Sequence, residues 1–256
     1  MSKNKNSTLW VSQNFLTSSS VINRIINISS INNQDHVIEI GPGKGHITRE
    51  LAKKCKKVTA VEYDKNLYEK TKIKLSGMKN IQLINNDFLR YNLPYTPYKV
   101  FANIPFNRTT SIIKKLTENK NPPEEAWLVM EKGAAKRFMG KPHENVLSLI
   151  LKPFYDLKIV YYFRKEDFHP CPSVDIVLLH IKKKTNPDIL QNQISKYTKF
   201  INNCLANRNY IYRYLSKKQI SKALSNSKLS HDITSKDMLY IQWLCLFRCY
   251  LQFVSK

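Results

Sequence analysis

Short apolar runs alternate with stretches of helical periodicity through the first two thirds of the chain. The runs are apolar almost without interruption, which is typical of strands that are covered on both faces. They lie at 37–40, 57–64, 80–87, 98–103, 125–130, 158–163 and 174–181. Helical periodicity occupies about 46–55, a segment ending near Gly77, and about 109–118, 131–139 and 144–152. This α/β alternation predicts a mostly parallel seven-stranded sheet with helices on both faces, whose last two strands pair as neighbours.

The pattern changes at the charged stretch KKKTNPD, residues 182–188. Beyond it only helical periodicity remains, in the amphipathic stretches YTKFINNCLANRNYIYRYL and DMLYIQWLCLFRCYLQF, which a Ser-, Lys- and Asn-rich middle joins. We therefore expect two domains, residues 1–184 and a small all-helical domain at 185–256.

Charge points to a partner, because 42 Lys and Arg residues outnumber 19 Asp and Glu residues and give a net charge of +23. Such a chain attracts polyanions and releases their counterions on binding. Codon bias in a chain rich in Lys, Asn and Ile explains part of the excess, but not two cations for every anion. Nucleic acid is the expected partner, ahead of an anionic membrane surface.

The ends and the cysteines favour an intracellular setting. No apolar run reaches the roughly 18 residues of a membrane span, and the start, MSKNKNSTLW, is polar and basic. The five cysteines are scattered without a C-x-x-C pair. We expect an unsecreted, cytoplasmic protein with reduced, structural thiols and no metal site.

A glycine-rich turn, GPGKG at 41–45, follows the first predicted strand and precedes a helix. In that context glycines let a ligand approach the backbone closely. Gly41 and Gly43 fit two interpretations. A dinucleotide site has the pattern G-x-G-x-x-G/A and needs a small residue at position 46. An S-adenosylmethionine (SAM) site tolerates G-x-G-x-G. His46 occupies that position and favours SAM.

Acidic residues end the next two predicted strands. Glu62 follows Gly41 by 21 positions, about the spacing at which a carboxylate meets two ribose hydroxyls. Asp87 closes the third strand, where its carboxylate can accept from an adenine amine while Phe88 flanks the ring. Because the carboxyl ends of parallel strands share one edge, where open sheets bind ligands, a nucleoside site is predicted there.

The fourth strand brings Asn103-Ile104-Pro105-Phe106 to the same edge. An adenine amine is a poor nucleophile because its lone pair is delocalised into the ring. The Asn103 side-chain oxygen and the Ile104 carbonyl can accept its two N–H groups and direct the lone pair at an electrophilic methyl group. Pro105 fixes the backbone and adds no donor, while Phe106 offers a ring for stacking, a contact of roughly 1–3 kcal/mol.

No strong base is needed for this reaction, because a sulfonium is a good leaving group and positioning carries most of the catalysis. A base taken out of its stack is usually held by more than one surface. Phe168 heads the stiff loop FHPCP before the last strand and is the candidate for the second contact. We interpret His169 as a hydrogen-bonded loop residue rather than an acid or base.

Together these segments resemble the Erm family of ribosomal RNA adenine N6-methyltransferases, which confer resistance to macrolide-type antibiotics. The resemblance covers nearly the whole chain, and FINNCLANRNYIYRYLSKKQI at 200–220 is similar to the Erm C-terminal domain. Within the motif FHPCPSVD at 168–175, Cys171 and Ser173 stand where many members have basic residues. The matching motifs are SQNFLTS (12–18), EIGPGKGHIT (39–48), NNDFL (85–89), NIPF (103–106) and FHPCPSVD (168–175).

The resemblance implies the Rossmann-like class I SAM-dependent methyltransferase fold and N6-methylation of one adenine of 23S rRNA. The adenine would lie near the entrance of the peptide tunnel, before the ribosome is fully assembled, and its methylation would give resistance to macrolides, lincosamides and streptogramin B. A monomer is expected. The resemblance also implies a base-stacking role for Phe168, a catalytic loop at Ile104 and Phe106, and SAM contacts at Asn14, Leu16, Gly41, Glu62, Asp87 and Asn103.

Three alternatives remain beside this interpretation. The first is a KsgA-type enzyme, which dimethylates two adenines of small-subunit rRNA. The second is a non-catalytic RNA-binding or assembly factor on the same fold, against which the intact Asn103-to-Phe106 motif argues. The third, a dinucleotide oxidoreductase, is disfavoured by His46 and the basic charge. The number of methyl groups added stays open.

Overall fold

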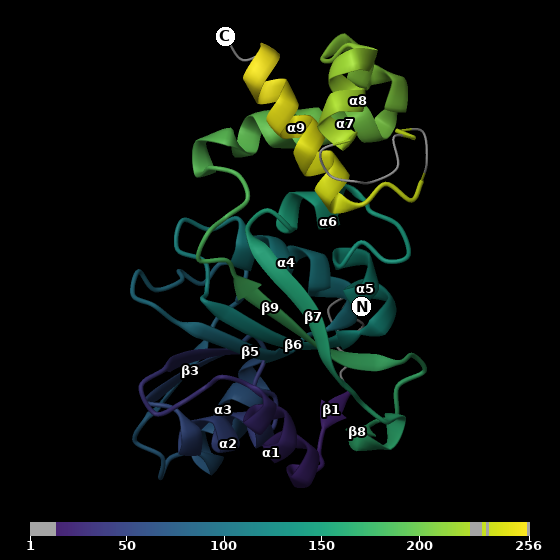
Figure 1. The fold of residues 1–256 in the computed structure, drawn as a ribbon. Helices are drawn as coiled ribbons and strands as arrows, with labels where there is room; N and C mark the ends of the chain where they lie inside the picture. Colours follow the sequence, from purple (N-terminus) through teal and green to yellow (C-terminus); the bar gives the residue numbers. More distant parts are fainter. Residues whose placement is uncertain (1–13, 226–231, 234–235, 255–256) are drawn as a thin grey trace, which may run out of the picture. The chain divides into compact units, whose positions relative to one another are not determined.

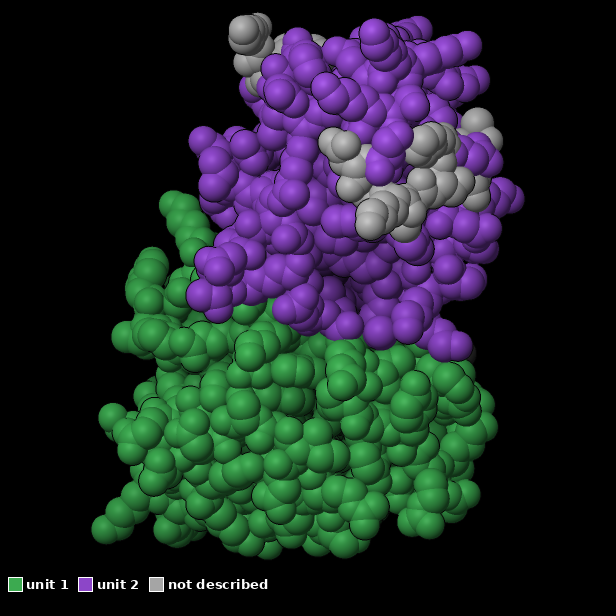
Figure 2. Space-filling model, in the orientation of Figure 1, with its two compact units in different colours: residues 1–135, 158–183 green, residues 136–157, 184–256 purple. Residues whose placement is uncertain are grey.

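The computed structural model describes residues 14–225, 232–233 and 236–254 (Figure 1). The polar N-terminal segment and the first two residues of the motif SQNFLTS lie outside these ranges. The chain forms two compact units, one made of residues 1–135 and 158–183 and the other of residues 136–157 and 184–256 (Figure 2). The domain division at residue 184 stays a prediction.

The first unit is built on the large sheet, whose strand order is β4-β3-β2-β5-β6-β9-β7. The strands from β4 to β6 pair in parallel, and β9 runs antiparallel to β6. This confirms the mostly parallel seven-stranded sheet and the pairing of its last two strands. The strands are β2 (His36–Ile40), β3 (Lys57–Glu62), β4 (Ile81–Asn85), β5 (Lys99–Asn103), β6 (Glu125–Glu131), β7 (Tyr155–Tyr162) and β9 (Ile176–Lys183).

Helices cover this sheet on both faces, with α1, α2 and α3 on one side and α4 on the other (Figure 1). Apolar residues of α1 and α2 form a buried core with Phe101, Trp127 and Leu178 of the sheet. Ser18 and Asp64 cap α1 and α3 by accepting from backbone amides of the first turn. The helices of this part are α1 (Ser19–Ile28), α2 (His46–Lys54), α3 (Lys65–Lys74), the 3-10 turn η1 (Phe106–Arg108), α4 (Thr109–Thr117) and α5 (Lys132–Phe138).

Several strand boundaries differ from the sequence prediction: β3 ends at Glu62 instead of residue 64, and β7 begins at Tyr155 instead of residue 158. Strand β4 ends at Asn85, so Asp87 lies in the following turn, where its own carboxylate binds the Leu89 amide. Strand β9 begins and ends two residues later than expected, because Lys182 still pairs with Glu125 at the far end of the long strand β6. Asp175 instead accepts the Lys132 amide through its backbone oxygen.

A second, two-stranded sheet was not predicted from the sequence. In it β1 (Phe15–Leu16) pairs antiparallel with β8 (Phe168–His169), which follows the 3-10 turn η2 (Lys165–Asp167). Each strand has two residues, too few for a period-2 pattern to register. This pairing ties the N-terminal motif to the FHPCP loop.

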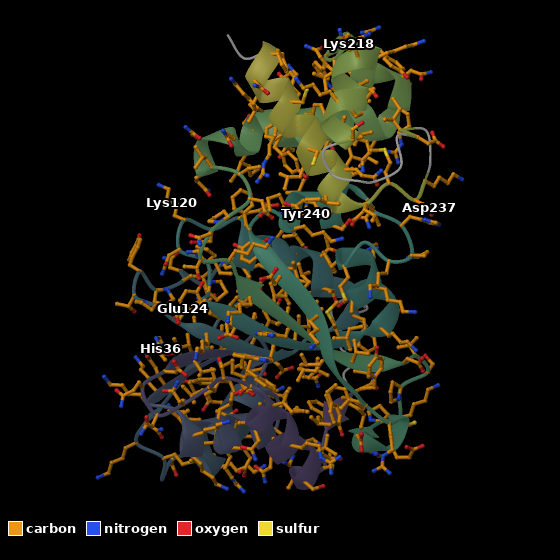
Figure 3. The ribbon with its side chains drawn as sticks, in the orientation of Figure 1. His36, Lys120, Glu124, Lys218, Asp237 and Tyr240 are labelled. Carbon is orange, nitrogen blue, oxygen red and sulfur yellow. The ribbon has the colours of Figure 1, made fainter. Side chains whose placement is uncertain are left out.

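The second unit has a helical core of its own, in which the rings of Tyr197, Phe200 and Phe247 pack together. Leu149 belongs to this core, and its carbonyl accepts from the Tyr197 hydroxyl. Tyr240, labelled in Figure 3, donates to Asp188. None of the described helices is long and apolar enough to cross a membrane. The helices are α6 (Val146–Leu151), η3 (Gln191–Gln193), α7 (Ile194–Ala206), η4 (Arg208–Arg213), α8 (Lys217–Ser225) and α9 (Tyr240–Val254).

Candidate active site

The glycine turn leaves β2 in a conformation that requires glycine. Gly41 and Gly43 have φ angles of +66° and +53°, the left-handed region that other residues rarely adopt. A Cβ on Gly43 would lie 2.7 Å from the Phe15 ring, whereas one on Gly41 would meet nothing within 4 Å. The turn therefore packs closely against β1 at one glycine and faces open space at the other.

Glu62 ends β3 with a carboxylate that two backbone amides hold in place. Gly43 N donates to one oxygen at 3.0 Å, and Asp64 N donates to the other at 2.9 Å. The residue is 2% exposed; burial raises the pKa of its carboxyl, and these amides counter that effect. The carboxylate is thus tied to the glycine turn and fixed at the strand end, and its contact with ribose hydroxyls stays a prediction.

A second carboxyl group, that of Glu39, lies buried in β2 before the glycine turn. Burial raises its pKa to about 8, the Glu62 carboxylate adds to this effect, and the Thr48 hydroxyl opposes it. Glu39 is therefore a neutral acid at pH 7, while Glu62 carries the amide contacts expected of a carboxylate.

Asp87 and Phe88 occupy the turn after β4. Asp87 accepts from the Leu89 amide at 3.0 Å and from Arg108 Nη1 at 3.2 and 3.3 Å. The Phe88 ring is buried, and Lys115 Nζ lies 5.6 Å from its centroid. A contact between Phe88 and a cofactor ring stays a prediction.

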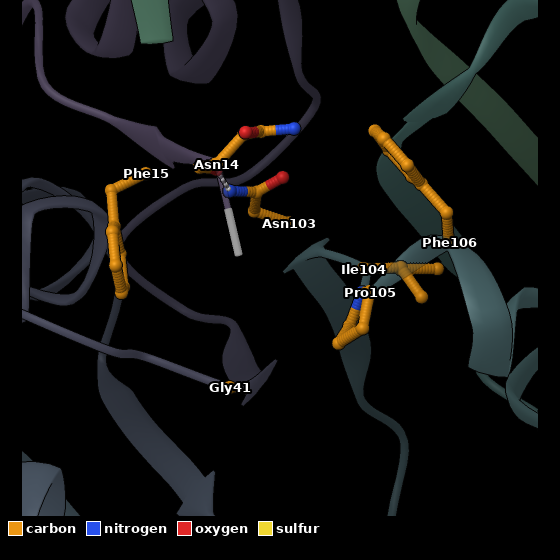
Figure 4. A pocket seen from close by; sticks show the side chains of 7 residues that line it. All are labelled: Asn14, Phe15, Gly41, Asn103, Ile104, Pro105 and Phe106. Atoms are coloured by element: carbon orange, nitrogen blue, oxygen red, sulfur yellow. Dashed lines mark hydrogen bonds between the residues drawn. The ribbon is translucent and has the colours of Figure 1, made fainter. Parts of the chain in front are cut away.

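A hollow at the end of β5 brings together residues from three distant segments (Figure 4). Asn103 Nδ2 donates to the Asn14 carbonyl at 2.8 Å, and the Asn103 amide oxygen lies at the other end of the amide, on the side of Phe106 (Figure 4). The Ile104 amide donates to Val129 O of β6 at 3.0 Å, which fixes the start of the loop. The lining residues are Asn14, Phe15, Gly41, Asn103, Ile104, Pro105 and Phe106.

Phe168 lies in the main core, and its stacking role stays a prediction. Its side chain is 4% exposed and belongs to the main core, with its ring edge-on to Phe163 at a centroid distance of 5.3 Å. Its register partner in β1 is Leu16, which is also buried. In this arrangement Phe168 supports the loop, and a contact with the target base would require the ring to leave the core.

Sequence reasoning did not single out three residues at this edge: Phe15, Tyr63 and Arg108. Phe15 covers Gly43, and Lys44 Nζ lies 5.0 Å from its ring centroid. Tyr63 is half exposed, and the Arg108 guanidinium carbon lies 5.4 Å from its ring centroid. An aromatic residue directly after Glu62 is a signal that the sequence did contain.

The arrangement fits a nucleoside-bearing cofactor. Gly41 leaves open space before the turn, the buried Glu62 carboxylate is fixed beside it, and Asp87 lies in the turn after the next strand. Two carboxylates at successive strand ends match the hydroxyl and amine donors of an adenosine group. The hollow that Gly41 lines also reaches Asn103 and Phe106, so the glycine turn and the loop after β5 share one edge of the sheet.

Comparisons with known proteins agree with this geometry. The model of the family "Ribosomal RNA adenine dimethylase" matches residues 3–249. The chain is 36% identical over 240 residues to an rRNA adenine N-6-methyltransferase of Lysinibacillus sphaericus, covering 93% of this chain and 95% of that protein. It is 37% identical over 210 residues to the ribosomal RNA small subunit methyltransferase A of Mycoplasmopsis synoviae, covering 80% of each.

A solved structure extends the likeness to the fold. The crystal structure of the 23S rRNA methyltransferase ErmE matches with a TM-score of 0.84 at 26% identity, over 92% of this chain and 99% of that one. The family match spans both units and includes the glycine turn, the Asn103-to-Phe106 motif and the helical region. The chain belongs to the ribosomal RNA adenine dimethylase family and is an rRNA adenine N6-methyltransferase of a SAM-dependent class.

Proposed function

We propose that this enzyme methylates N6 of one adenine of 23S rRNA near the entrance of the peptide tunnel. The modification would give resistance to macrolide, lincosamide and streptogramin B antibiotics. The likeness to ErmE, a 23S rRNA methyltransferase, extends through nearly all of both chains and supports this target. The match to the small-subunit enzyme covers four fifths of each chain, and small-subunit rRNA is the second candidate target.

The residues at the carboxyl edge of the sheet would hold SAM. When bound, SAM supplies an electrophilic methyl group on a sulfonium. Glu62 would accept from the ribose hydroxyls and Asp87 from the adenine amine, because each presents carboxylate oxygens at a strand end. The full proposed set is Asn14, Leu16, Gly41, Gly43, Glu62, Asp87, Phe88 and Asn103.

One observation carries the catalytic proposal, the hydrogen bond from Asn103 Nδ2 to Asn14 O. The bond takes up the donor end of the amide and leaves the acceptor oxygen on the side of Phe106, which also lines the hollow (Figure 4). Asn103 Oδ1 and Ile104 O would then accept the two N–H groups of the target amine, and its lone pair would face the methyl group.

The remaining loop residues would hold the target base. Pro105, at φ −59°, supplies no N–H that competes for these acceptors. Phe106 is half buried and lines the hollow, so part of its ring is open to a stacked base. Phe168 is kept as the second stacking candidate.

The direct test uses methyl-labelled SAM with protein-free 23S and 16S rRNA, followed by mapping of the modified nucleotide. We expect label in one adenine of 23S rRNA and none in 16S rRNA. Label in 16S rRNA alone would assign the enzyme to the KsgA type. Absence of label in both RNAs would overturn the proposed activity. A susceptible host expressing the enzyme should grow in erythromycin, and one expressing Asn103→Ala should not.

The proposal also covers the assembly state of the RNA substrate and the oligomeric state of the enzyme. We propose that the enzyme acts as a monomer in the cytoplasm, on 23S rRNA that is not yet fully assembled. The same assay with intact large subunits should then give little label, because ribosomal proteins and folded RNA restrict access to the target adenine.

A further inference from the structure

The side chain of Arg108, in the turn η1 after the Asn103-to-Phe106 motif, forms an ion pair with Asp87. Arg108 is the last residue of η1, and its Nη1 lies 3.2 and 3.3 Å from the two carboxylate oxygens of Asp87. The guanidinium carbon also lies 5.4 Å from the Tyr63 ring centroid. Arg108 thus contacts a carboxylate and an aromatic ring at once.

Hydrogen bonds hold the chain around each of these two partners, and the Asn85 side chain links the end of β4 to Tyr63. Tyr63 follows Glu62 at the end of β3, and Asn85 Nδ2 donates to the backbone oxygens of Glu62 and Tyr63 at 2.9 and 3.2 Å. The Leu89 amide holds Asp87 Oδ1 at 3.0 Å. The Tyr63 ring is 52% exposed, so it presents a large open surface at this edge.

A guanidinium and the amine edge of an adenine are chemically alike in this position. Both are flat, both donate N–H groups to a carboxylate, and both pack on an aromatic ring. Arg108 makes with Asp87 and Tyr63 the contacts that a bound adenine would make with the same two residues. Since the guanidinium engages both oxygens of Asp87, the two groups compete for it.

We propose that Arg108 is a gate on the adenine subsite and leaves Asp87 when the cofactor binds. This inference rests on the proposed role of Asp87 as acceptor for the cofactor's adenine amine. The Arg108 side chain is 37% exposed and that of Asp87 is 20% exposed, so water screens their attraction and the pair opens at modest cost. The gate therefore lowers cofactor affinity without abolishing it.

The loop geometry makes Arg108 a suitable gate. Its backbone amide donates to Pro105 O at 3.0 Å, and Thr109 Oγ1 donates to Phe106 O at 3.1 Å, so the main chain of η1 is held. The side chain can then swing between Asp87 and solvent while Pro105 and Phe106 keep their places.

The test compares the affinity of S-adenosylhomocysteine (SAH) for wild type and Arg108→Met by calorimetry, without RNA. Methionine keeps much of the apolar stem but has neither charge nor N–H donors. SAH lacks the sulfonium charge, so loss of the arginine does not change a repulsion between two cations. We expect SAH to bind about two- to fivefold more tightly to Arg108→Met, from the ordinary strength of an exposed ion pair.

Arg90→Met is the matched control. Arg90 is exposed in the same turn, where its amide donates to Asp87 O, and the substitution removes the same charge. We expect its SAH affinity to equal that of wild type. Added salt should tighten SAH binding to wild type by screening the Arg108–Asp87 pair, and should have less effect on Arg108→Met.

Whether Arg108→Met raises or lowers the affinity for SAH decides between the possible roles of Arg108. Unchanged affinity in Arg108→Met overturns the gate, and weaker binding shows instead that the arginine stays and packs on the adenine. In both cases wild type still binds SAH and the proposed function stands. Absence of SAH binding in wild type and in both variants overturns the cofactor site and the gate together.

Discussion

The candidate site has a cofactor half, made of Gly41, Gly43, Glu62 and Asp87, and a target half, made of residues 103–106 and Phe168. In the cofactor half each group belongs to a parallel strand end or to the turn that follows it. In the target half Asn103 depends on the Asn14 carbonyl, and Phe168 depends on its pairing with β1. The groups of the first half therefore follow strand ends that the local pattern predicts, whereas those of the second also depend on contacts with the N-terminal segment.

The largest expected effect tests how Phe168 contributes to the target half. Phe168→Ala removes a buried ring from the main core, so we expect the free energy of unfolding to fall by about 3–5 kcal/mol. Phe168→Leu fills most of the space and should cost much less. Urea unfolding of both variants measures these effects.

The same variants separate packing from base stacking. If Phe168 acts through the core, RNA affinity of the leucine variant should stay near that of wild type. An alanine variant as stable as wild type that binds RNA much more weakly would contradict the core role, and would show that the ring leaves the core to stack on the base.

Asn103→Ala tests the division between the halves directly. Loss of one oriented acceptor at the target amine should lower kcat by about 10²–10³. SAH affinity, measured by calorimetry, should change far less, because the carboxylates at the other strand ends remain. Comparable activity in the variant would refute the catalytic assignment.

Glu62→Gln is the matched variant in the cofactor half. We expect it to lower cofactor affinity more than kcat, the reverse of Asn103→Ala. Glutamine keeps the shape but loses the charge and turns one acceptor into a donor beside the Gly43 and Asp64 amides. Cofactor affinity should fall while kcat at saturating SAM stays close to wild type. If both variants lowered kcat alone, the two halves would not be separate.

The sequence predicted the parts of the fold that repeat a local pattern. Apolar strands, the glycine turn and the acid at position 62 follow from period, spacing and strand order, and the structure has them in the expected order, with strand ends that differ by up to three residues. The β1–β8 pairing could not be predicted, because two-residue strands carry no periodic signal and their register depends on residues 152 and 154 positions apart. The Arg108–Asp87 pair likewise joins two turns whose approach follows from tertiary packing.

The smallest expected effect concerns Glu39, which is buried in β2 before the glycine turn. Because burial raises the pKa of its carboxyl group, the stability of the protein should depend on pH. The folded protein keeps this carboxyl protonated up to pH about 8, whereas the unfolded chain ionises it above its ordinary value of 4.5. The unfolded state then binds fewer protons, so the free energy of unfolding falls as pH rises, by about 1.4 kcal/mol per pH unit until about pH 8. Glu39→Gln cannot titrate, so its unfolding free energy should fall less than that of wild type between pH 6 and pH 7. Parallel pH profiles for the two proteins would mean that Glu39 is ionised in the folded state, beside the carboxyl group of Glu62.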